Sequence, residues 1–180
     1  MSNLPAIHKA IPTTYAHTRF RSRLEARWAA WFDLAGWQWD YEPMDVDGWS
    51  PDFLIRGRSP ILVEVKPAAW IDGPRLSLDA FAKATKATGV DILLLGLGPI
   101  VKDGFGYIGM CSDGDAGGFS AAVCQETYLP AAHFGYCSDT QGFNDRLSGY
   151  YEGGSWDGRG HTLVEPNWRR AGSLTQWSPK

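Results

Sequence analysis

Apolar residues near the N-terminus recur at the spacing of a helix. Leu24, Trp28 and Trp31 lie three or four positions apart, which places them on one helical face. Thr18 before this stripe and Gly36 after it are residue types that favour the start and the end of a helix. The pattern therefore predicts a helix over residues 18–36. Residues 1–17, interrupted by prolines, are expected to form an irregular arm.

Three short strands are predicted after this helix. Residues 37–42 alternate aromatic and polar side chains, and residues 52–55 form a short apolar segment entered through a proline. Residues 61–66 are rich in β-branched side chains and stop at the next proline. A second helix is expected over residues 77–88, followed by an almost entirely apolar strand over residues 90–95.

The order helix, three strands, helix, strand indicates an α/β fold in which helices flank a mixed central sheet. Later in the chain, residues 107–110 and 121–125 suit a hairpin, and residues 167–176 suit a short helix. The length of 180 residues fits one domain. Its expected parts are an arm, a core and a C-terminal extension of strands and loops, over residues 1–17, 18–95 and 96–180.

Composition and charge refine this interpretation. No apolar run is long enough to cross a bilayer, and three cysteines without a Cys-x-x-Cys pair argue against a disulfide framework. The formal net charge is −3, yet residues 1–36 hold five basic side chains against two acidic ones. A basic end on an acidic protein suits phosphate binding, and a solvated, salt-bridged helix would give the same pattern.

Candidate chemistry lies on the strand over residues 61–66. Glu64 and Lys66 share one face because strand side chains alternate, whereas Val63 and Val65 point to the other face. Charged groups on such a strand cost desolvation unless a partner compensates. Asp52, at the start of the neighbouring strand, can supply a second carboxylate, and two carboxylates suit Mg²⁺. Lys66 would orient or deprotonate water, or stabilise negative charge on a phosphate.

A further acid is predicted on the first helix. With Leu24 at zero and 100° per residue, Arg21 falls at about 60° and Glu25 at about 100°, beside the apolar arc. Arg23 and Arg27 fall at about 260° and 300°, on another face. Glu25 and Arg21 are therefore expected at the site, although a simple i,i+4 ion pair on the surface is the competing interpretation.

Two short strings carry a resemblance to a known family. SPDF at residues 50–53, followed by VEVK at residues 63–66, resembles the PD-(D/E)xK motif of restriction-endonuclease-like nucleases. FRSRLEARW at residues 20–28 is similar to the first helix of phage and prophage members, including relatives of transposase-type endonucleases, and YEP at residues 41–43 fits the next strand. The resemblance covers residues 15 to about 95, which is roughly half of the chain.

The resemblance implies an αβββαβ restriction-endonuclease-like core and a set of site residues. Asp52 and Glu64 would bind Mg²⁺ together with the backbone carbonyl of Val65. Lys66 would be the catalytic lysine, and Glu25 would be an auxiliary acid at the metal. Mn²⁺ is expected to substitute for Mg²⁺, and cleavage would leave 5′-phosphates.

We therefore expect a Mg²⁺-dependent endonuclease of DNA, associated with a phage or mobile element and located in the cytoplasm of a bacterium or infected host. Arg21, Arg23 and Arg27 are the expected nucleic-acid contacts. Trp49 and Trp70 flank the site in sequence and suit either packing or base stacking. The alternatives are a structure-specific or RNA nuclease, and a non-catalytic DNA-binding or phage assembly protein with the same fold. No membrane partner is expected, and a homodimer is left open.

Overall fold

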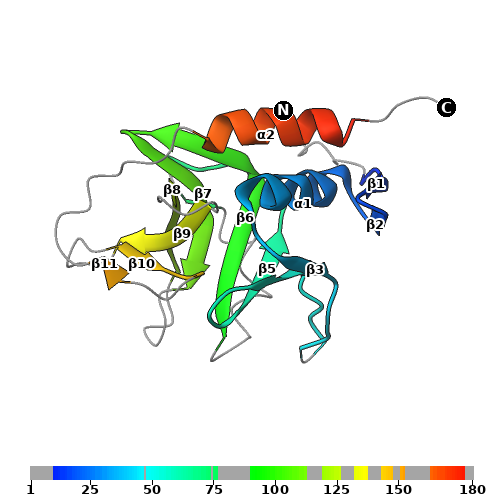
Figure 1. Cartoon of the computed structure of the whole chain (residues 1–180), viewed down its shortest axis with the longest axis horizontal. Helices are drawn as coiled ribbons and strands as arrows, with labels where there is room; N and C mark the ends of the chain where they lie inside the picture. Colours follow the sequence, from blue (N-terminus) through cyan, green and yellow to red (C-terminus); the bar gives the residue numbers. More distant parts are fainter. Residues whose placement is uncertain are drawn as a thin grey trace, which may run out of the picture.

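The computed structural model describes most of the chain and places its elements in one sheet, one hairpin and two helices (Figure 1). The described residues are 10–46, 48–73, 75–76, 90–112, 119–126, 132–137, 143–147, 151–152 and 163–176. None of the helices in these ranges is long and apolar enough to span a bilayer.

The central sheet has nine strands in the order β11-β10-β9-β8-β7-β6-β5-β4-β3. Neighbouring strands are antiparallel except β5 and β6, which are parallel, so the sheet is mixed as predicted. The strands are β3 (Trp39–Tyr41), β4 (Phe53–Arg56), β5 (Pro60–Val65), β6 (Asp91–Lys102), β7 (Phe105–Ser112), β8 (Phe119–Glu126), β9 (Ala132–Cys137), β10 (Phe143–Asp145) and β11 (Tyr151–Glu152).

Helix α1 (Arg23–Ala35) begins later than the sequence predicts. Ser22 is the N-cap, because its hydroxyl accepts a hydrogen bond from the backbone N–H of Glu25 at 3.1 Å. The predicted end is confirmed: Gly36 adopts the left-handed conformation, with φ 77°, and caps the helix. The predicted start at Thr18 is wrong, since Thr18–Phe20 pairs as a strand before Ser22 can begin the helix.

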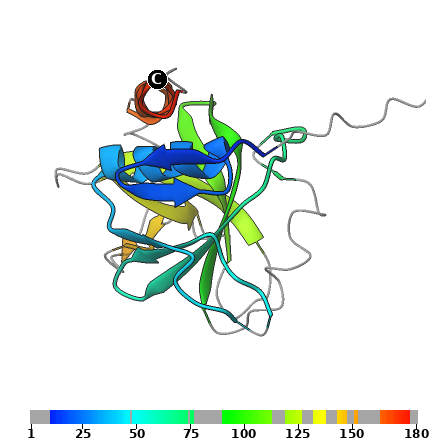
Figure 2. The same cartoon turned by 90° about the vertical axis from the view of Figure 1, so that its right-hand side faces the viewer.

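The segment before α1 is a hairpin rather than an irregular arm. Strands β1 (Thr13–Tyr15) and β2 (Thr18–Phe20) are antiparallel, and they enclose a two-residue turn. Both turn residues, Ala16 and His17, have positive φ, as a tight hairpin turn requires. Figure 2 shows the hairpin lying alongside α1. The prediction of an irregular arm is wrong here because the turn of the hairpin lacks the glycine or asparagine that usually signals such a geometry. Residues 1–9 lie outside the described residues.

The core is built on α1 and a second helix, α2 (Val164–Leu174), which lies beside it (Figures 1 and 2). Trp28, Trp31 and Phe32 are almost fully buried on the predicted apolar face of α1. The rings of Trp28 and Trp168 are 4.5 Å apart between centroids, so aromatic packing joins the two helices. The short C-terminal helix predicted over residues 167–176 is thus confirmed, with an earlier start at Val164.

The remaining predicted strands are all present in the structure, but their lengths differ from the prediction. The three strands after α1 are confirmed as β3, β4 and β5, and the predicted later hairpin is confirmed as β7 and β8. Strand β6 is longer than residues 90–95, because a register shift between Leu95 and Ile100 lets pairing with β7 continue beyond the glycines. The helix predicted over residues 77–88 lies outside the described residues.

Candidate active site

Asp52 and Glu64 are brought together by the pairing of two strands. The register of β4 and β5 pairs Phe53 with Val63, which sets Asp52 opposite Glu64. Both side chains are buried, with relative exposures of 4% and 5%. One carboxylate oxygen of Asp52 accepts a hydrogen bond from the backbone N–H of Val65 at 2.7 Å. Two adjacent buried carboxylates are therefore fixed at the edge of the β4–β5 pair.

Lys66 follows β5 directly and faces Glu64, as the period of a strand predicts. Its ammonium group forms an ion pair with one carboxylate oxygen of Glu64. The backbone N–H of Lys66 donates to the carbonyl of Leu95 at 2.9 Å, which holds the residue against β6. The lysine thus has a fixed backbone and a cationic end beside the carboxylates.

Arg21 reaches the same site from outside the helix. One of its guanidinium nitrogens donates to Asp52 at 2.5 Å, and Nε lies 2.8 Å from a carboxylate oxygen of Glu42. The sequence argument placed Arg21 near the site by helical angle, but Arg21 precedes the N-cap Ser22. Its position comes instead from the extended chain that links β2 to α1.

Glu25 lies in the same cluster, because one of its carboxylate oxygens is 4.0 Å from Nε of Arg21 in the i,i+4 ion pair that was the competing interpretation. It is 8% exposed, accepts a hydrogen bond from the Ser22 hydroxyl at 2.7 Å, and accepts another from the Tyr41 hydroxyl at 2.6 Å. The Arg21 backbone N–H donates to the same Tyr41 oxygen at 3.0 Å. Tyr41 therefore links β3 to the start of α1. The carboxylate of Glu25 thus accepts from the hydroxyl of the N-cap Ser22 and from the Tyr41 phenol.

Two residues that sequence reasoning did not assign contact the site. Glu42 pairs with Arg21 and has a positive φ of 45°, an uncommon conformation for a residue other than glycine. Trp49 is buried, and its indole N–H donates to a carboxylate oxygen of Glu64 at 2.9 Å. The sequence left Trp49 open between packing and base stacking. Its burial and this bond give it a packing role, and no sequence pattern marks the contact to Glu64.

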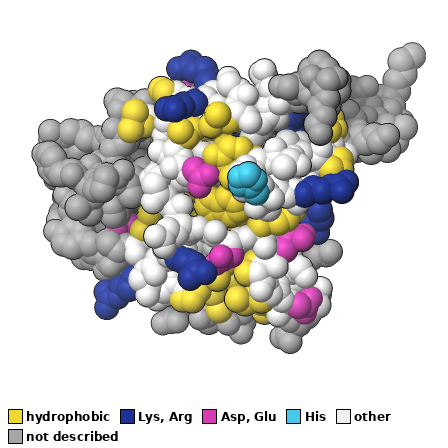
Figure 3. Space-filling view, turned by 45° about the vertical axis from the view of Figure 1, so that its right-hand side comes forward, with side chains coloured by type: hydrophobic (Ala, Val, Ile, Leu, Met, Phe, Trp, Pro, Cys, Tyr) yellow, Lys and Arg dark blue, Asp and Glu magenta, His cyan; other side chains and the backbone are white. Residues whose placement is uncertain are grey.

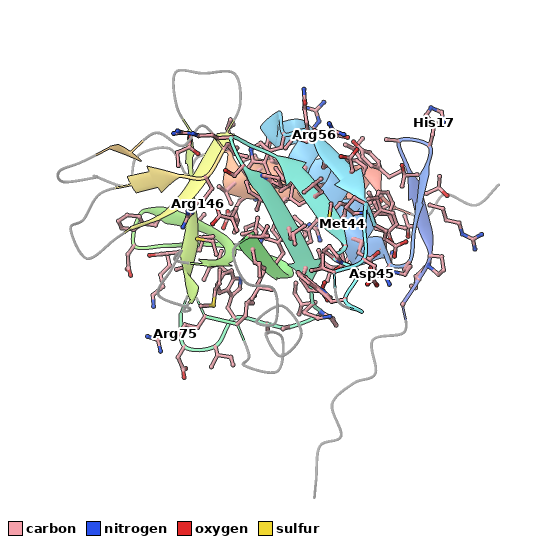
Figure 4. The ribbon with its side chains drawn as sticks, turned by 90° about the horizontal axis from the view of Figure 1, so that it is seen from below. His17, Met44, Asp45, Arg56, Arg75 and Arg146 are labelled. Carbon is pink, nitrogen blue, oxygen red and sulfur yellow. The ribbon has the colours of Figure 1, made fainter. Side chains whose placement is uncertain are left out.

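The loop between β3 and β4 has its own internal support. Asp45 accepts hydrogen bonds from the backbone N–H of Gly48 at 2.8 Å and from the Ser50 hydroxyl at 3.2 Å. Val46 and Trp49 form an isolated β-bridge. Met44 and Asp45, labelled in Figure 4, belong to this loop. The loop therefore presents the Trp49 indole to Glu64 from a defined conformation.

The three arginines expected to contact nucleic acid have different environments. Arg21 is at the site, and Arg23 is exposed at the first turn of α1. Arg27 is turned toward α2: its guanidinium lies 3.9 Å from the centroid of the Trp168 ring and donates to the Trp168 carbonyl. Burial lowers the pKa of Arg27 below its usual value. These contacts give Arg27 a structural role between the helices.

Burial and like charge change the acidity of Asp52. The pKa of Asp52 rises to about 7, first because burial disfavours the ionised form and then because Glu64 and Glu25 repel its charge. The Val65 N–H and the Arg21 cation oppose this rise. The pKa of Tyr41 also rises, through burial and its bond to Glu25. The site therefore holds more negative charge than its own cations compensate.

The chemistry of the donor set fits a hard divalent cation. Asp52, Glu64 and the carbonyl of Val65 offer oxygen ligands, and a cation would relieve the repulsion that raises the pKa of Asp52. Among the described residues, no three or more His, Cys, Asp or Glu side chains form a group that could hold a metal ion. Asp52, Glu64 and the Val65 carbonyl are the ligands that the geometry brings together, and Glu25 as an auxiliary acid stays a prediction.

Comparison with known proteins finds no relative of this chain. No family model matches the chain, and neither a curated protein nor a solved structure matches it. The interpretation of the site therefore rests on its own geometry and on the sequence pattern.

Removing the Trp49 donor is expected to destabilise the fold by about 1–3 kcal/mol, the usual loss when a charged buried group loses one hydrogen bond. Trp49→Phe keeps a large aromatic ring and leaves one Glu64 oxygen without its indole partner. Urea unfolding monitored by circular dichroism measures the change. Trp70→Phe is the matched control, since the Trp70 indole donates to the Gly98 carbonyl and does not contact Glu64. Loss of a hydrogen bond to a neutral carbonyl destabilises a protein less than loss of one to a buried carboxylate. Equal destabilisation in both variants would therefore contradict the special role of Trp49.

Proposed function

We propose that this protein is a Mg²⁺-dependent endonuclease that hydrolyses phosphodiester bonds of DNA. The observation that carries the proposal is the pair of buried carboxylates, Asp52 and Glu64, with Lys66 beside them. A structural ion pair explains Glu64 and Lys66, but it does not explain Asp52, a second buried acid whose pKa is raised by burial and then by the charge of Glu64. Such groups are characteristic of functional sites.

Each residue of the cluster has a role that hydrolysis requires. Asp52, Glu64 and the Val65 carbonyl would hold the cation, which when bound activates water and neutralises charge on the phosphate. Lys66 orients the attacking water and stabilises the negative charge that develops as the new phosphorus–oxygen bond forms and the bond to the sugar oxygen breaks. Arg21 grips a phosphate oxygen through its planar fork. The leaving group is the 3′-oxygen, so the product carries a 5′-phosphate.

The order of the elements supports the same proposal. Helix α1, strands β3, β4 and β5, and strand β6 follow one another in the order expected for an αβββαβ restriction-endonuclease-like core. Asp52 precedes β4, and Glu64 lies on β5, as the PD-(D/E)xK pattern requires. The single parallel pair, β5 and β6, is also compatible with a helical crossover between those strands.

A second candidate is a DNA-binding or phage assembly protein that keeps this fold without turnover. It is favoured by the internal partners of the carboxylates. Asp52 is bonded to Arg21 and Val65, and Glu64 is bonded to Trp49 and Lys66. A site that satisfies its own charges in this way is compatible with a structural network. The raised pKa of Asp52 favours the nuclease, because burial and the nearby acids disfavour its ionised form more than Val65 and Arg21 stabilise it.

Incubation of the wild-type protein with nucleic acids tests the proposal directly. The substrates are linear, supercoiled, branched and single-stranded DNA, and RNA, each with Mg²⁺, Mn²⁺, Ca²⁺ or EDTA. We expect cleavage of DNA with Mg²⁺ or Mn²⁺, no cleavage with EDTA, and 5′-phosphates at the new ends. Binding of DNA without cleavage in either metal would support the second candidate. Cleavage confined to RNA would replace DNA as the substrate.

A further inference from the structure

The hairpin and the residues after it carry a row of arginines. Arg19, Arg21 and Arg23 are exposed, whereas Phe20 between them is fully buried and Ser22 is half-buried. Arg19 lies on β2, the chain bends at Arg21 and Ser22, and Arg23 is the first residue of α1. The three arginine side chains therefore reach solvent from three consecutive parts of the chain, namely the hairpin, the bend and the start of the helix.

The outer two arginines have free charges. Within the described part of the chain, no ion pair involves Arg19 or Arg23, whereas Arg21 between them is paired with Asp52 and Glu42. The side chain of Arg21 remains 57% exposed despite these partners. Arg21 therefore holds the row at the candidate active site, and Arg19 and Arg23 are available to bind an anion.

The charge around the row is of one sign along the sequence. Residues 1–24 contain no aspartate or glutamate, in a protein whose net charge is −3. The cross-strand partner of Arg19 is Thr14, which is neutral. Figure 3 shows basic and acidic side chains interspersed over one face of the molecule rather than one field of positive charge. Acids surround Arg21, which lies beside Asp52, Glu42 and Glu25, and the Tyr15 hydroxyl of β1 donates to Asp33. An acidic polymer would thus be held by the placed charges of Arg19 and Arg23.

We propose that Arg19 and Arg23 bind phosphates that flank the scissile phosphate, so that the hairpin is a track for one nucleic-acid strand. This inference rests on the proposed function for the place of the scissile phosphate, beside Asp52 and Arg21. Arginine suits this ligand because its fork donates two hydrogen bonds to one phosphate. Contacts of this kind position the strand without reading its bases.

Salt titration of DNA binding tests the track separately from turnover. The probe is a fluorescein-labelled duplex of mixed sequence, titrated in Ca²⁺ at several salt concentrations. We expect Arg19→Ala and Arg23→Ala each to make the slope of log K against log salt shallower by about one phosphate contact, and the double variant by about two. Arg19→Lys should keep the slope, since the charge remains. The matched control is Arg75→Ala, which removes one charge from a residue far from the hairpin in Figure 4.

The outcomes separate the track from the nuclease proposal. If Arg75→Ala flattens the slope as much as Arg19→Ala, the effect is one of net charge and the track is wrong. If both hairpin variants keep the wild-type slope while the wild-type protein cuts DNA, the track fails and the nuclease stands. If the slopes change as expected and no metal supports cleavage, the track stands and the nuclease fails. Tighter binding of the hairpin arginines to anionic lipid vesicles than to the duplex would overturn the assignment to nucleic acid.

Discussion

Glu64→Gln and Lys66→Met are each expected to lower the rate of metal-dependent DNA cleavage by about a thousandfold or more. Glutamine has nearly the shape of glutamate and can still accept the Trp49 hydrogen bond, so the loss follows from the missing negative charge. Methionine keeps the length of the Lys66 side chain and removes its cation. Initial rates on a supercoiled plasmid with Mg²⁺, compared with the wild-type protein, measure both effects.

The matched controls are Asp40→Asn and Arg56→Met, which remove an exposed ion pair between β3 and β4. Arg56 donates to Asp40 at 3.0 Å, and such surface pairs contribute little to stability. Both controls should cut at the wild-type rate. Circular dichroism and thermal melts establish that every variant is folded. A folded Glu64→Gln or Lys66→Met protein that cleaves as fast as the controls would show that the site is wrongly assigned.

Asp52→Asn is expected to stabilise the metal-free protein near pH 8 by an amount on the order of a few kcal/mol. The folded pKa of Asp52 is about 7, above its ordinary value of 3.8, so the folded state binds more protons than the unfolded state between these values. Stability therefore falls as the pH rises from about 4 to about 7, and the loss is complete above pH 7. Asparagine removes the repelling charge and can still accept the Val65 hydrogen bond.

Urea unfolding of wild type and Asp52→Asn from pH 4 to pH 8, in EDTA, measures this difference. The two proteins should be closest at pH 4 and should diverge toward pH 8. Added Mn²⁺ should raise the melting temperature of the wild type, because a ligand that binds only the folded state stabilises it by about 2.7 kcal/mol at one hundred times its Kd. The melting temperature of Asp52→Asn should rise less with Mn²⁺. A gap that stays constant with pH would contradict the raised pKa of Asp52.

The sequence predicted the parts of the site that depend on strand period. Glu64 and Lys66 are neighbours because alternation along β5 allows no other arrangement, and Asp52 joins them because β4 and β5 are consecutive antiparallel strands. The same reasoning found the buried face of α1, since Trp28 and Trp31 repeat at helical spacing. These are local regularities that a single sequence can reveal.

The sequence did not predict the parts that depend on contacts across the fold. Arg27 has the charge of a phosphate contact, yet α2, more than a hundred positions later, supplies the Trp168 carbonyl and ring that engage it. Glu25 was predicted at the site, but the sequence did not reveal that the hydroxyls of Ser22 and Tyr41 donate hydrogen bonds to its carboxylate. The hairpin turn at Ala16 and His17 uses positive φ without glycine, so composition does not signal it.

The position of the parallel pair within an otherwise antiparallel sheet has a consequence for folding. Every polar residue of the candidate site lies between Arg21 and Lys66, and β4 meets β5 through a short connection. Closing the β4–β5 hairpin, which brings Asp52 to Glu64, costs little chain entropy, whereas pairing β6 with β5 closes a much longer loop. The carboxylates therefore approach one another early, before β6 provides the Leu95 carbonyl that fixes the backbone of Lys66. A nascent chain would hold the acids of the site first and the anchored lysine last.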